Sequence, residues 1–160
     1  MMEADAVACI PLPTRQKTRH LARALAPLLK ASDLLILDGQ LGSGKTFFVR
    51  ALARALGLPE RIRVTSPTFS LVHEIATRPP IVHADLYRLS STREVAELAL
   101  DEQREAGAVV IVEWGLPYVE TLGGDGLILE FRHEPRRVHA RATGARSSIT
   151  LRALEAQRLG

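Results

Sequence analysis

The eight residues Gly39-Gln40-Leu41-Gly42-Ser43-Gly44-Lys45-Thr46 form a pattern of two glycines separated by four residues and followed by a lysine and a hydroxyl. Residues 34–37 before them are a short apolar run typical of a buried parallel strand. After them, apolar residues recur at helical spacing from Val49 to Leu56 and stop at Gly57. A glycine-rich turn between a strand and a helix lets backbone N–H groups converge on phosphate oxygens, and the dipole of the helix attracts the same anion. The sequence therefore predicts a nucleoside triphosphate site.

Two residues of this stretch have specific roles in the predicted site. Lys45 is expected to reach the β- and γ-phosphates, and Thr46 is expected to place its hydroxyl on Mg²⁺. The alternative is an ordinary glycine-rich turn that contains a lysine and a threonine by chance. The strand before the turn and the helix after it favour a phosphate loop over that alternative.

Length and composition predict one domain over residues 1–160, with residues 145–160 as a C-terminal tail that can form a helix. Hydrophobic residues make up 46% of the chain and aromatic residues 4%, so the core must consist mostly of Leu, Val, Ile and Ala. Glu3 and Asp5 stand where a signal peptide would be basic, and no stretch has the length of a membrane span. The single Cys9 excludes an internal disulfide, which suits a reducing compartment. We therefore expect a cytoplasmic protein with no membrane partner.

The net charge is +3, but the basic residues are unevenly distributed. Residues 131–160 hold seven arginines against Glu134 and Glu155. Such a segment could meet RNA or an acidic protein surface. Because Phe131 is the one aromatic residue among them, the pattern favours a solvated surface over direct nucleic-acid binding.

Periodicity and turn residues predict the remaining elements. Strands are expected at residues 7–12, 70–75, 81–85 and 108–112, and a hairpin at residues 127–131 and 137–142 that turns through Glu134-Pro135-Arg136. Helices are expected over residues 15–30, shortened or kinked by Pro27, after a capping box of Ser91 and Glu94, and in a tail capped by Ser147 or Ser148. Strands alternating with helices predict a three-layer α/β fold like that of phosphate-loop NTPases. Its sheet is mostly parallel, with antiparallel strands added at the C-terminal end.

Two acidic residues end predicted strands. Ligands of a parallel sheet bind outside the carboxyl ends of its strands, where Gly39, Asp85 and Glu113 all fall. Glu113 is a Walker-B-like acid that could hold Mg²⁺ or orient the hydrolytic water, and Asp85 is the other candidate for both roles. Spacing does not decide which acid has which role. The alternative for each acid is a structural carboxylate that caps a helix or pairs with Arg88.

Three other kinds of residue are candidates near this site. Thr68, in a proline turn with Ser66, could offer its hydroxyl to Mg²⁺ or to phosphate, or could simply be part of the turn. His73 and His83 have no partner at metal-ligand spacing, which favours structural roles. Trp114 could pack beside the nucleotide or dock a partner, with a core position as the alternative.

Four motifs together resemble the TsaE (YjeE) family. They are residues 37–46, Ser66-Pro67-Thr68-Phe69, His83-Ala84-Asp85-Leu86-Tyr87-Arg88 and Val112-Glu113-Trp114, in matching order and spacing. The resemblance covers roughly residues 18–144. That family is the small bacterial ATPase needed to make threonylcarbamoyladenosine at position 37 of tRNAs that read codons beginning with A.

The resemblance implies an ATPase that acts with TsaB and TsaD and reaches tRNA through them, with hydrolysis resetting that complex between turnovers. It places Lys45 and Thr46 at the nucleotide and Mg²⁺, and Thr68 in a switch-like loop. It makes Asp85 the acid needed for hydrolysis, and Glu113 the magnesium-side acid beside Trp114. The family commonly has a second threonine after Thr46, where this chain has Phe47. That substitution bears on the hydrolysis rate rather than on nucleotide binding.

Two other functions remain open from sequence. A small-molecule kinase usually needs an arginine-bearing lid, and no lid insertion is evident between Tyr87 and Val109. A nucleotide sensor that does not hydrolyse ATP is the third reading, which Phe47 makes conceivable. Base preference is not encoded in a recognisable motif, so ATP follows from the resemblance.

Overall fold

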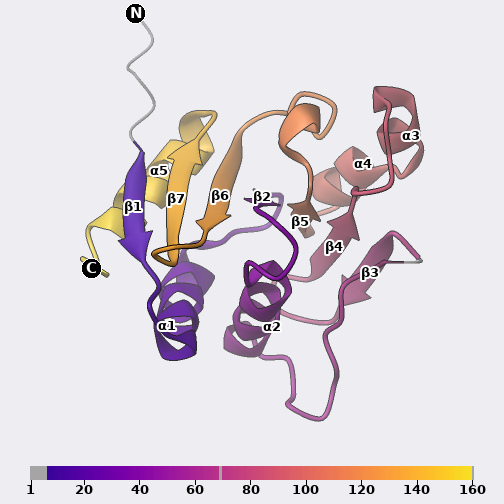
Figure 1. The fold of residues 1–160 in the computed structure, drawn as a ribbon. Helices are drawn as coiled ribbons and strands as arrows, with labels where there is room; N and C mark the ends of the chain where they lie inside the picture. Colours follow the sequence, from indigo (N-terminus) through magenta and orange to yellow (C-terminus); the bar gives the residue numbers. More distant parts are fainter. Residues whose placement is uncertain (1–6, 69, 160) are drawn as a thin grey trace, which may run out of the picture.

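The computed structural model describes residues 7–68 and 70–159, so Phe69 of the second motif, and Glu3 and Asp5, lie outside the described residues. The described strands form one sheet in the order β1-β7-β6-β2-β5-β4-β3 (Figure 1). They are β1 (Ala8–Pro11), β2 (Leu34–Asp38), β3 (Val72–Ile75), β4 (Ile81–Asp85), β5 (Val109–Glu113), β6 (Gly126–Arg132) and β7 (Arg137–Ala142). The helices are α1 (Arg15–Leu25), η1 (Ala26–Leu28), α2 (Lys45–Ala55), α3 (Thr92–Glu97), α4 (Leu100–Glu105), η2 (Leu116–Tyr118) and α5 (Ala145–Glu155).

The centre of the sheet is parallel and its edges are antiparallel. Strands β6, β2, β5 and β4 run parallel, which confirms the predicted fold class. The predicted hairpin forms between β6 and β7. Antiparallel pairing also occurs where the sequence analysis did not place it, between β1 and β7 and between β3 and β4. The cause in the second case is the short turn of residues 76–80, which has no room for the crossover that parallel strands need.

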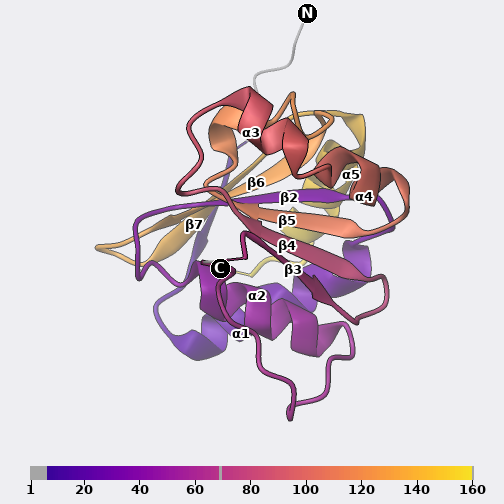
Figure 2. The ribbon, with the colours of Figure 1, turned by 90° about the vertical axis from the view of Figure 1, so that its right-hand side faces the viewer.

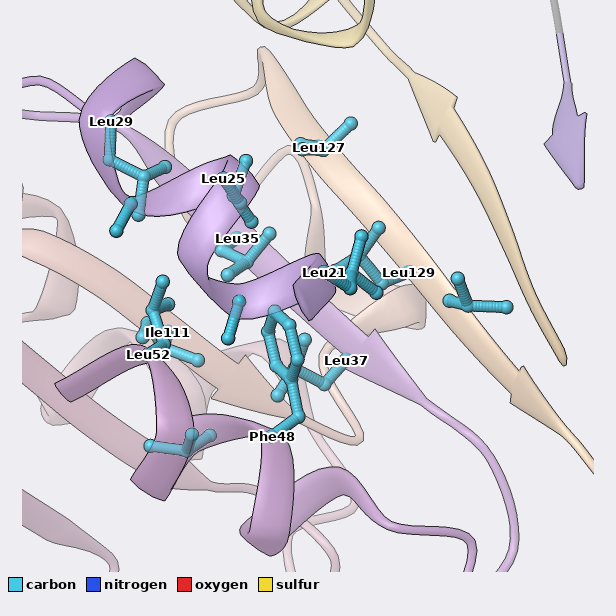
Figure 3. Close-up of a cluster of buried hydrophobic side chains, with 14 of the residues drawn as sticks. Leu21, Leu25, Leu29, Leu35, Leu37, Phe48, Leu52, Ile111, Leu127 and Leu129 are labelled. Carbon is cyan, nitrogen blue, oxygen red and sulfur yellow. The ribbon is translucent and has the colours of Figure 1, made fainter. Parts of the chain in front are cut away.

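Helices cover both faces of the sheet. Helices α1 and α2 lie side by side on one face, and α3 and α4 lie on the other (Figure 2). The larger core fills the space between the sheet and the first pair. Figure 3 shows its central side chains, which come from α1 (Leu21, Leu25), α2 (Phe48, Leu52), the segment before β2 (Leu29) and the strands (Leu35, Leu37, Ile111, Leu127, Leu129). This packing fixes the start of α2 against the end of β2, which positions the glycine-rich loop.

Helix ends follow the sequence with two exceptions. Pro27 ends α1 at Leu25 and turns the next residues into the 3-10 helix η1, as expected. The capping box of Ser91 and Glu94 forms as predicted. The helix that follows is split into α3 and α4, because Ala99 adopts a left-handed conformation with φ of 53°.

The second exception is the C-terminal helix α5, whose N-cap is Gly144 rather than Ser147 or Ser148, although the Ser147 hydroxyl accepts a hydrogen bond from the backbone N–H of Gly144 at 3.1 Å. It begins at Ala145, and the carboxylate of Asp125 accepts hydrogen bonds from the backbone N–H groups of Arg146 and Ser147, both at 2.9 Å. The Ser147 hydroxyl donates to the same carboxylate at 2.7 Å. A residue from before β6 therefore caps a helix more than fifteen residues later in the chain.

Several arginines of the C-terminal segment have structural partners. Arg146 forms an ion pair with Asp33 at 3.1 Å, and Arg132 forms one with Glu130 at 2.7 Å. Arg146 therefore joins α5 to the segment before β2, and Arg132 pairs within β6, so these two arginines are not merely a solvated surface. In residues 7–68 and 70–159, no helix has both the length and the apolar character needed to cross a membrane.

Candidate nucleotide-binding site

The glycine-rich loop bends sharply between β2 and α2. Gly39, Gly42 and Gly44 have φ values of 137°, 78° and 104°, which residues with a Cβ rarely adopt. At Gly39 a Cβ would also lie 2.6 Å from the backbone oxygen of Phe131 on β6. The loop therefore needs glycine at this position both for its backbone angle and for its close approach to the sheet.

Lys45, the first residue of α2, is buried with 5% of its surface exposed. Its ammonium donates hydrogen bonds to the backbone oxygens of Gly39 and of Gln40, the latter at 3.1 Å. Burial lowers the pKa of Lys45 below its ordinary value of 10.5, and the carboxylates of Glu113, Asp38 and Asp85 oppose this shift. Lys45 is therefore a buried basic group whose charged form three nearby acids favour.

The two predicted acids lie beside each other at the end of the parallel sheet. Asp85 ends β4 and Glu113 ends β5, and the two residues are paired in register, with Leu37 of β2 opposite Glu113 on its other side. Residues in register on adjacent strands share a face of the sheet. That face is the one covered by α2, since Leu37 belongs to the core beneath it. The strand ends therefore bring Asp85, Glu113 and Lys45 together, as the sequence predicts.

His83 is a member of this cluster that the sequence analysis did not identify. It is fully buried, and its Nε2 lies 2.8 Å from Oε2 of Glu113, which is 3% exposed. The Nδ1 atom of His83 is buried with no hydrogen-bond partner among the described residues. The available signal was the two-residue period of a strand, which puts His83 and Asp85 on the same face. The contact with His83 therefore fixes one carboxylate oxygen of Glu113.

Asp85 is held by the loop that carries the second motif. Its Oδ2 accepts a hydrogen bond from the Ser66 hydroxyl at 3.2 Å, and its Oδ1 accepts one from the backbone N–H of Tyr87 at 2.9 Å. Thr68 is exposed, and its hydroxyl donates to the backbone oxygen of Ser66 at 3.4 Å. Movement of this loop would therefore change the hydrogen bonding of Asp85 directly.

Aromatic side chains flank the lysine and the start of α2. The ring of Trp114 lies 4.5 Å from Nζ of Lys45 and 5.0 Å from the ring of Tyr87. Phe47 is half-buried, with the guanidinium groups of Arg15 and Arg19 over its ring at 5.6 and 5.3 Å. The side chain of Phe47 therefore faces α1.

These groups line a cavity of about 550 Å³. Its lining includes the predicted residues Leu41, Gly42, Ser43, Gly44, Lys45, Thr46, Phe47, Thr68, Asp85, Glu113 and Trp114. Gly39 and Gln40 are not among the lining residues, because their carbonyl groups turn to the ammonium of Lys45. Arg132, Arg136 and Arg137 of the β6–β7 hairpin also line the cavity, which the sequence analysis did not predict.

The residues present fit a magnesium–phosphate group. The hydroxyl oxygen of Ser43, within the loop, is buried and has no hydrogen-bond partner among the described residues. The described residues contain no group of three or more His, Cys, Asp and Glu able to hold a metal by themselves. Mg²⁺ is typically held by one or two carboxylates together with substrate phosphates, so Thr46, Asp85 and Glu113 are a suitable oxygen donor set.

The comparison with protein families is decisive for classification. The model of the family described as "Threonylcarbamoyl adenosine biosynthesis protein TsaE" matches residues 12–142. The chain belongs to the TsaE family. Its role therefore lies in the biosynthesis of threonylcarbamoyladenosine in tRNA, as the resemblance of the four motifs predicts.

Individual TsaE relatives agree with this classification. A Streptomyces coelicolor protein named tRNA threonylcarbamoyladenosine biosynthesis protein TsaE is 47% identical over 115 residues, which is 69% of this chain and 76% of that protein. A Rickettsia felis protein of the same name is 39% identical over 104 residues, 64% of this chain and 60% of that protein. The crystal structure of Bacillus subtilis YdiB matches with a TM-score of 0.79 and 25% identity, covering 98% of this chain and 99% of that one.

Proposed function

We propose that this TsaE protein binds ATP with Mg²⁺ and hydrolyses it in the service of tRNA threonylcarbamoyladenosine synthesis, acting with the TsaB and TsaD proteins. The observation that carries the proposal is the cluster at one cavity of a desolvated lysine, the loop hydroxyls and two strand-end acids. Phosphoryl transfer to water asks a protein mainly to position the γ-phosphate and to stabilise its charge. The cluster supplies a cation and carboxylates for both tasks.

Each side chain has a role in this proposal. Lys45 binds the β- and γ-phosphates, exchanging its bonds to the loop carbonyls for bonds to the phosphate oxygens. Thr46 and Glu113 hold Mg²⁺, which when bound neutralises the developing charge on the phosphates. Asp85 orients the attacking water and accepts its hydrogen bond once the contact from Ser66 is released. His83 keeps Glu113 in place from inside the sheet.

The chemical step is tested by replacing each acid with its amide. Asp85→Asn and Glu113→Gln keep side-chain size but remove the charge, and we expect each to lower kcat by about 10²- to 10³-fold. Nucleotide affinity, measured with a fluorescent ATP analogue, should change much less than it does in Lys45→Ala. Asp101→Asn removes an exposed carboxylate of α4 and is the matched control. If both amide variants hydrolyse ATP at the parental rate, the assignment of the acids is wrong.

The partner assignment has a separate test. ATP turnover is measured with the purified protein alone and again after adding TsaB, TsaD and tRNA, and we expect stimulation that needs both proteins. Hydrolysis without any stimulation would reject the partners but keep the ATPase. Nucleotide binding with no phosphate release under any of these conditions would instead identify a sensor, the reading that Phe47 leaves open.

One observation favours a second candidate function, a small-molecule kinase. Arg132, Arg136 and Arg137 of the β6–β7 hairpin line the cavity, so arginines reach it without a lid insertion after Tyr87. Arginines over a donor phosphate are what such kinases use to stabilise transfer. Incubation with γ-labelled ATP and a panel of metabolites distinguishes the two functions, since the ATPase releases all of the label as inorganic phosphate.

A further inference from the structure

Two neighbouring helices of this chain carry basic residues and no acidic ones. Helices α1 and α2 together contain 22 residues, with seven Lys and Arg and no Asp or Glu. The whole chain has 21 Lys and Arg against 18 Asp and Glu, which leaves 14 basic and 18 acidic residues elsewhere. The net charge of +3 therefore consists of a strongly basic helix pair on an otherwise acidic protein.

The arginines of these helices form a continuous surface. A groove between α1 and α2 is lined by Arg19, Arg23, Arg50 and Arg54, and the adjoining hollow is lined by Arg50, Arg54 and Arg63. We call these five arginines the basic face. Figure 2 shows the two helices side by side beneath the sheet. Within each helix the arginines are four residues apart, which spaces them by about 6 Å along the axis. They therefore make two rows of charge on either side of one groove.

The basic face is not neutralised within the molecule. Among the described residues, none of its arginines has a carboxylate oxygen within 4 Å, although Glu60 lines the groove. Two of these arginines are partly occupied: Arg54 donates to the backbone oxygens of Pro59 and Ile62 at 2.5 and 2.6 Å, and Arg50 donates through one N–H to that of Val64 at 3.3 Å. Arg19, Arg23, Arg50 and Arg63 are exposed to solvent. Four guanidinium groups are thus available to an external anion.

Surface composition identifies the kind of anion. Protein interfaces have an apolar core that is depleted in charged residues. None of the exposed large apolar side chains among the described residues lies on α1 or α2. Interfaces with nucleic acids are polar and strongly positive, and most of their hydrogen bonds go to phosphate and sugar. The basic face has the second composition.

From this geometry we propose that the basic face binds the phosphate backbone of RNA directly. This goes beyond the proposed function, in which tRNA is reached only through the partner proteins. The groove accommodates a backbone rather than base edges, because guanidinium groups bind phosphate through bidentate hydrogen bonds and Phe47 is the one aromatic side chain that lines it. Binding is accordingly expected to depend on salt and to discriminate little between sequences.

The test is the binding of a fluorescently labelled tRNA transcript to the purified protein alone, followed by anisotropy between 50 and 200 mM salt. Four to five phosphate contacts predict an affinity loss of about 10²- to 10³-fold over this range. The triple variant Arg23→Ala, Arg50→Ala, Arg63→Ala should bind about 10²-fold more weakly near 0.1 M salt and reduce the slope of log K against log salt by roughly 2 to 3. None of these three residues lines the nucleotide cavity.

The matched control removes three exposed arginines elsewhere, Arg93, Arg152 and Arg158, and should retain the parental salt slope. Thermal melting and binding of an ATP analogue verify that both triple variants are folded, which makes this test independent of the ATPase assignment. Equal weakening in both triple variants would show a net-charge effect and overturn the proposal. RNA binding by the basic-face variant at the parental affinity would also overturn it. Polyglutamate serves as an acidic polymer without phosphate, and a variant that lost affinity for polyglutamate but not for RNA would overturn the proposal as well.

Discussion

Arg104 on α4 offers a sharp test of what holds this fold together. Its guanidinium donates to four backbone oxygens: that of Ser32 at 2.6 Å, Leu122 at 3.1 Å, Gly124 at 2.6 Å and Asp125 at 3.0 Å. The partner residues precede β2 and β6, so they lie at the amino-terminal ends of the parallel strands, whereas the cavity lies at the carboxyl ends. One side chain thus joins three segments that are up to 72 residues apart in sequence. We predict that Arg104→Ala destabilises the protein strongly.

The magnitude follows from the number of bonds. A protein hydrogen bond contributes about 0.5–1.5 kcal/mol net. Three of the four partner residues, Ser32, Gly124 and Asp125, are partly exposed, so their carbonyls regain water, and four bonds at the lower half of that range amount to about 3 kcal/mol. For a chain of this size 1 kcal/mol corresponds to about 2–4 °C, so the Tm should fall by roughly 6–12 °C. Arg104→Lys keeps the positive charge but lacks the planar guanidinium with its several N–H donors, so it should recover less than half of the stability that Arg104→Ala loses.

Urea denaturation and thermal melting measure both effects. The control is Arg93→Ala, because Arg93 is 90% exposed and pairs with Glu97 at 3.6 Å. An exposed pair of this kind contributes about 0.5 kcal/mol or less. At temperatures well below the Tm, Arg104→Ala should bind ATP with the parental affinity, since the cavity lies at the opposite ends of the strands. A melting temperature equal to that of the control would refute the reasoning.

Three further predictions concern single side chains. Burial lowers the pKa of Lys45 and a bound triphosphate would raise it again, so nucleotide binding should be accompanied by proton uptake at alkaline pH. Calorimetry in two buffers of different ionisation enthalpy measures this proton uptake, and Lys45→Met should abolish it. The pKa of Asp125 is lowered, since hydrogen bonds from Ser147 and Arg146 outweigh its desolvation. The contribution of this carboxylate to stability is therefore present above the unfolded pKa and lost as the pH falls through the folded pKa. Asp125→Ala should lower the free energy of unfolding by about 1–2 kcal/mol at pH 7. It should also make the free energy of unfolding less dependent on pH on the acid side, which urea denaturation at several pH values measures. Phe48→Ala, at a fully buried position, should cost about 3–5 kcal/mol in urea denaturation, whereas Ile149→Ala, on the exposed side of α5, should cost little.

The parallel centre of the sheet could be predicted because its signals are local. An apolar run followed by a glycine-rich turn defines β2 and α2, and a β-branched run ending in an acid defines β5. The same rule, that strands end at one edge, brought Asp85 and Glu113 together. The antiparallel edges were not predicted for β1 and β3, because short edge strands carry little periodicity and their partners are fixed by tertiary contacts.

The missing parts of the site share one property, which is that their partners are distant in sequence. His83 and Glu113 are 30 residues apart, and neither strand alone shows that the imidazole meets the carboxylate. The cap of α5 by Asp125 and the arginines of the β6–β7 hairpin at the cavity are of the same kind. Their residue types were visible, but their meeting depends on the order of the strands.

Charge shows most clearly why a linear window misleads. Counting along the chain singled out residues 131–160, yet Arg132 and Arg146 there form ion pairs with carboxylates of the sheet region. Helices α1 and α2 are separated by nineteen residues that include the acids Asp33 and Asp38, and nothing in the linear sequence shows that their arginines line one groove. Only their packing joins the two rows of arginine. A better sequence signal for such a surface is found by taking each predicted helix separately. An amphipathic helix that contains several arginines and no Asp or Glu indicates a basic surface.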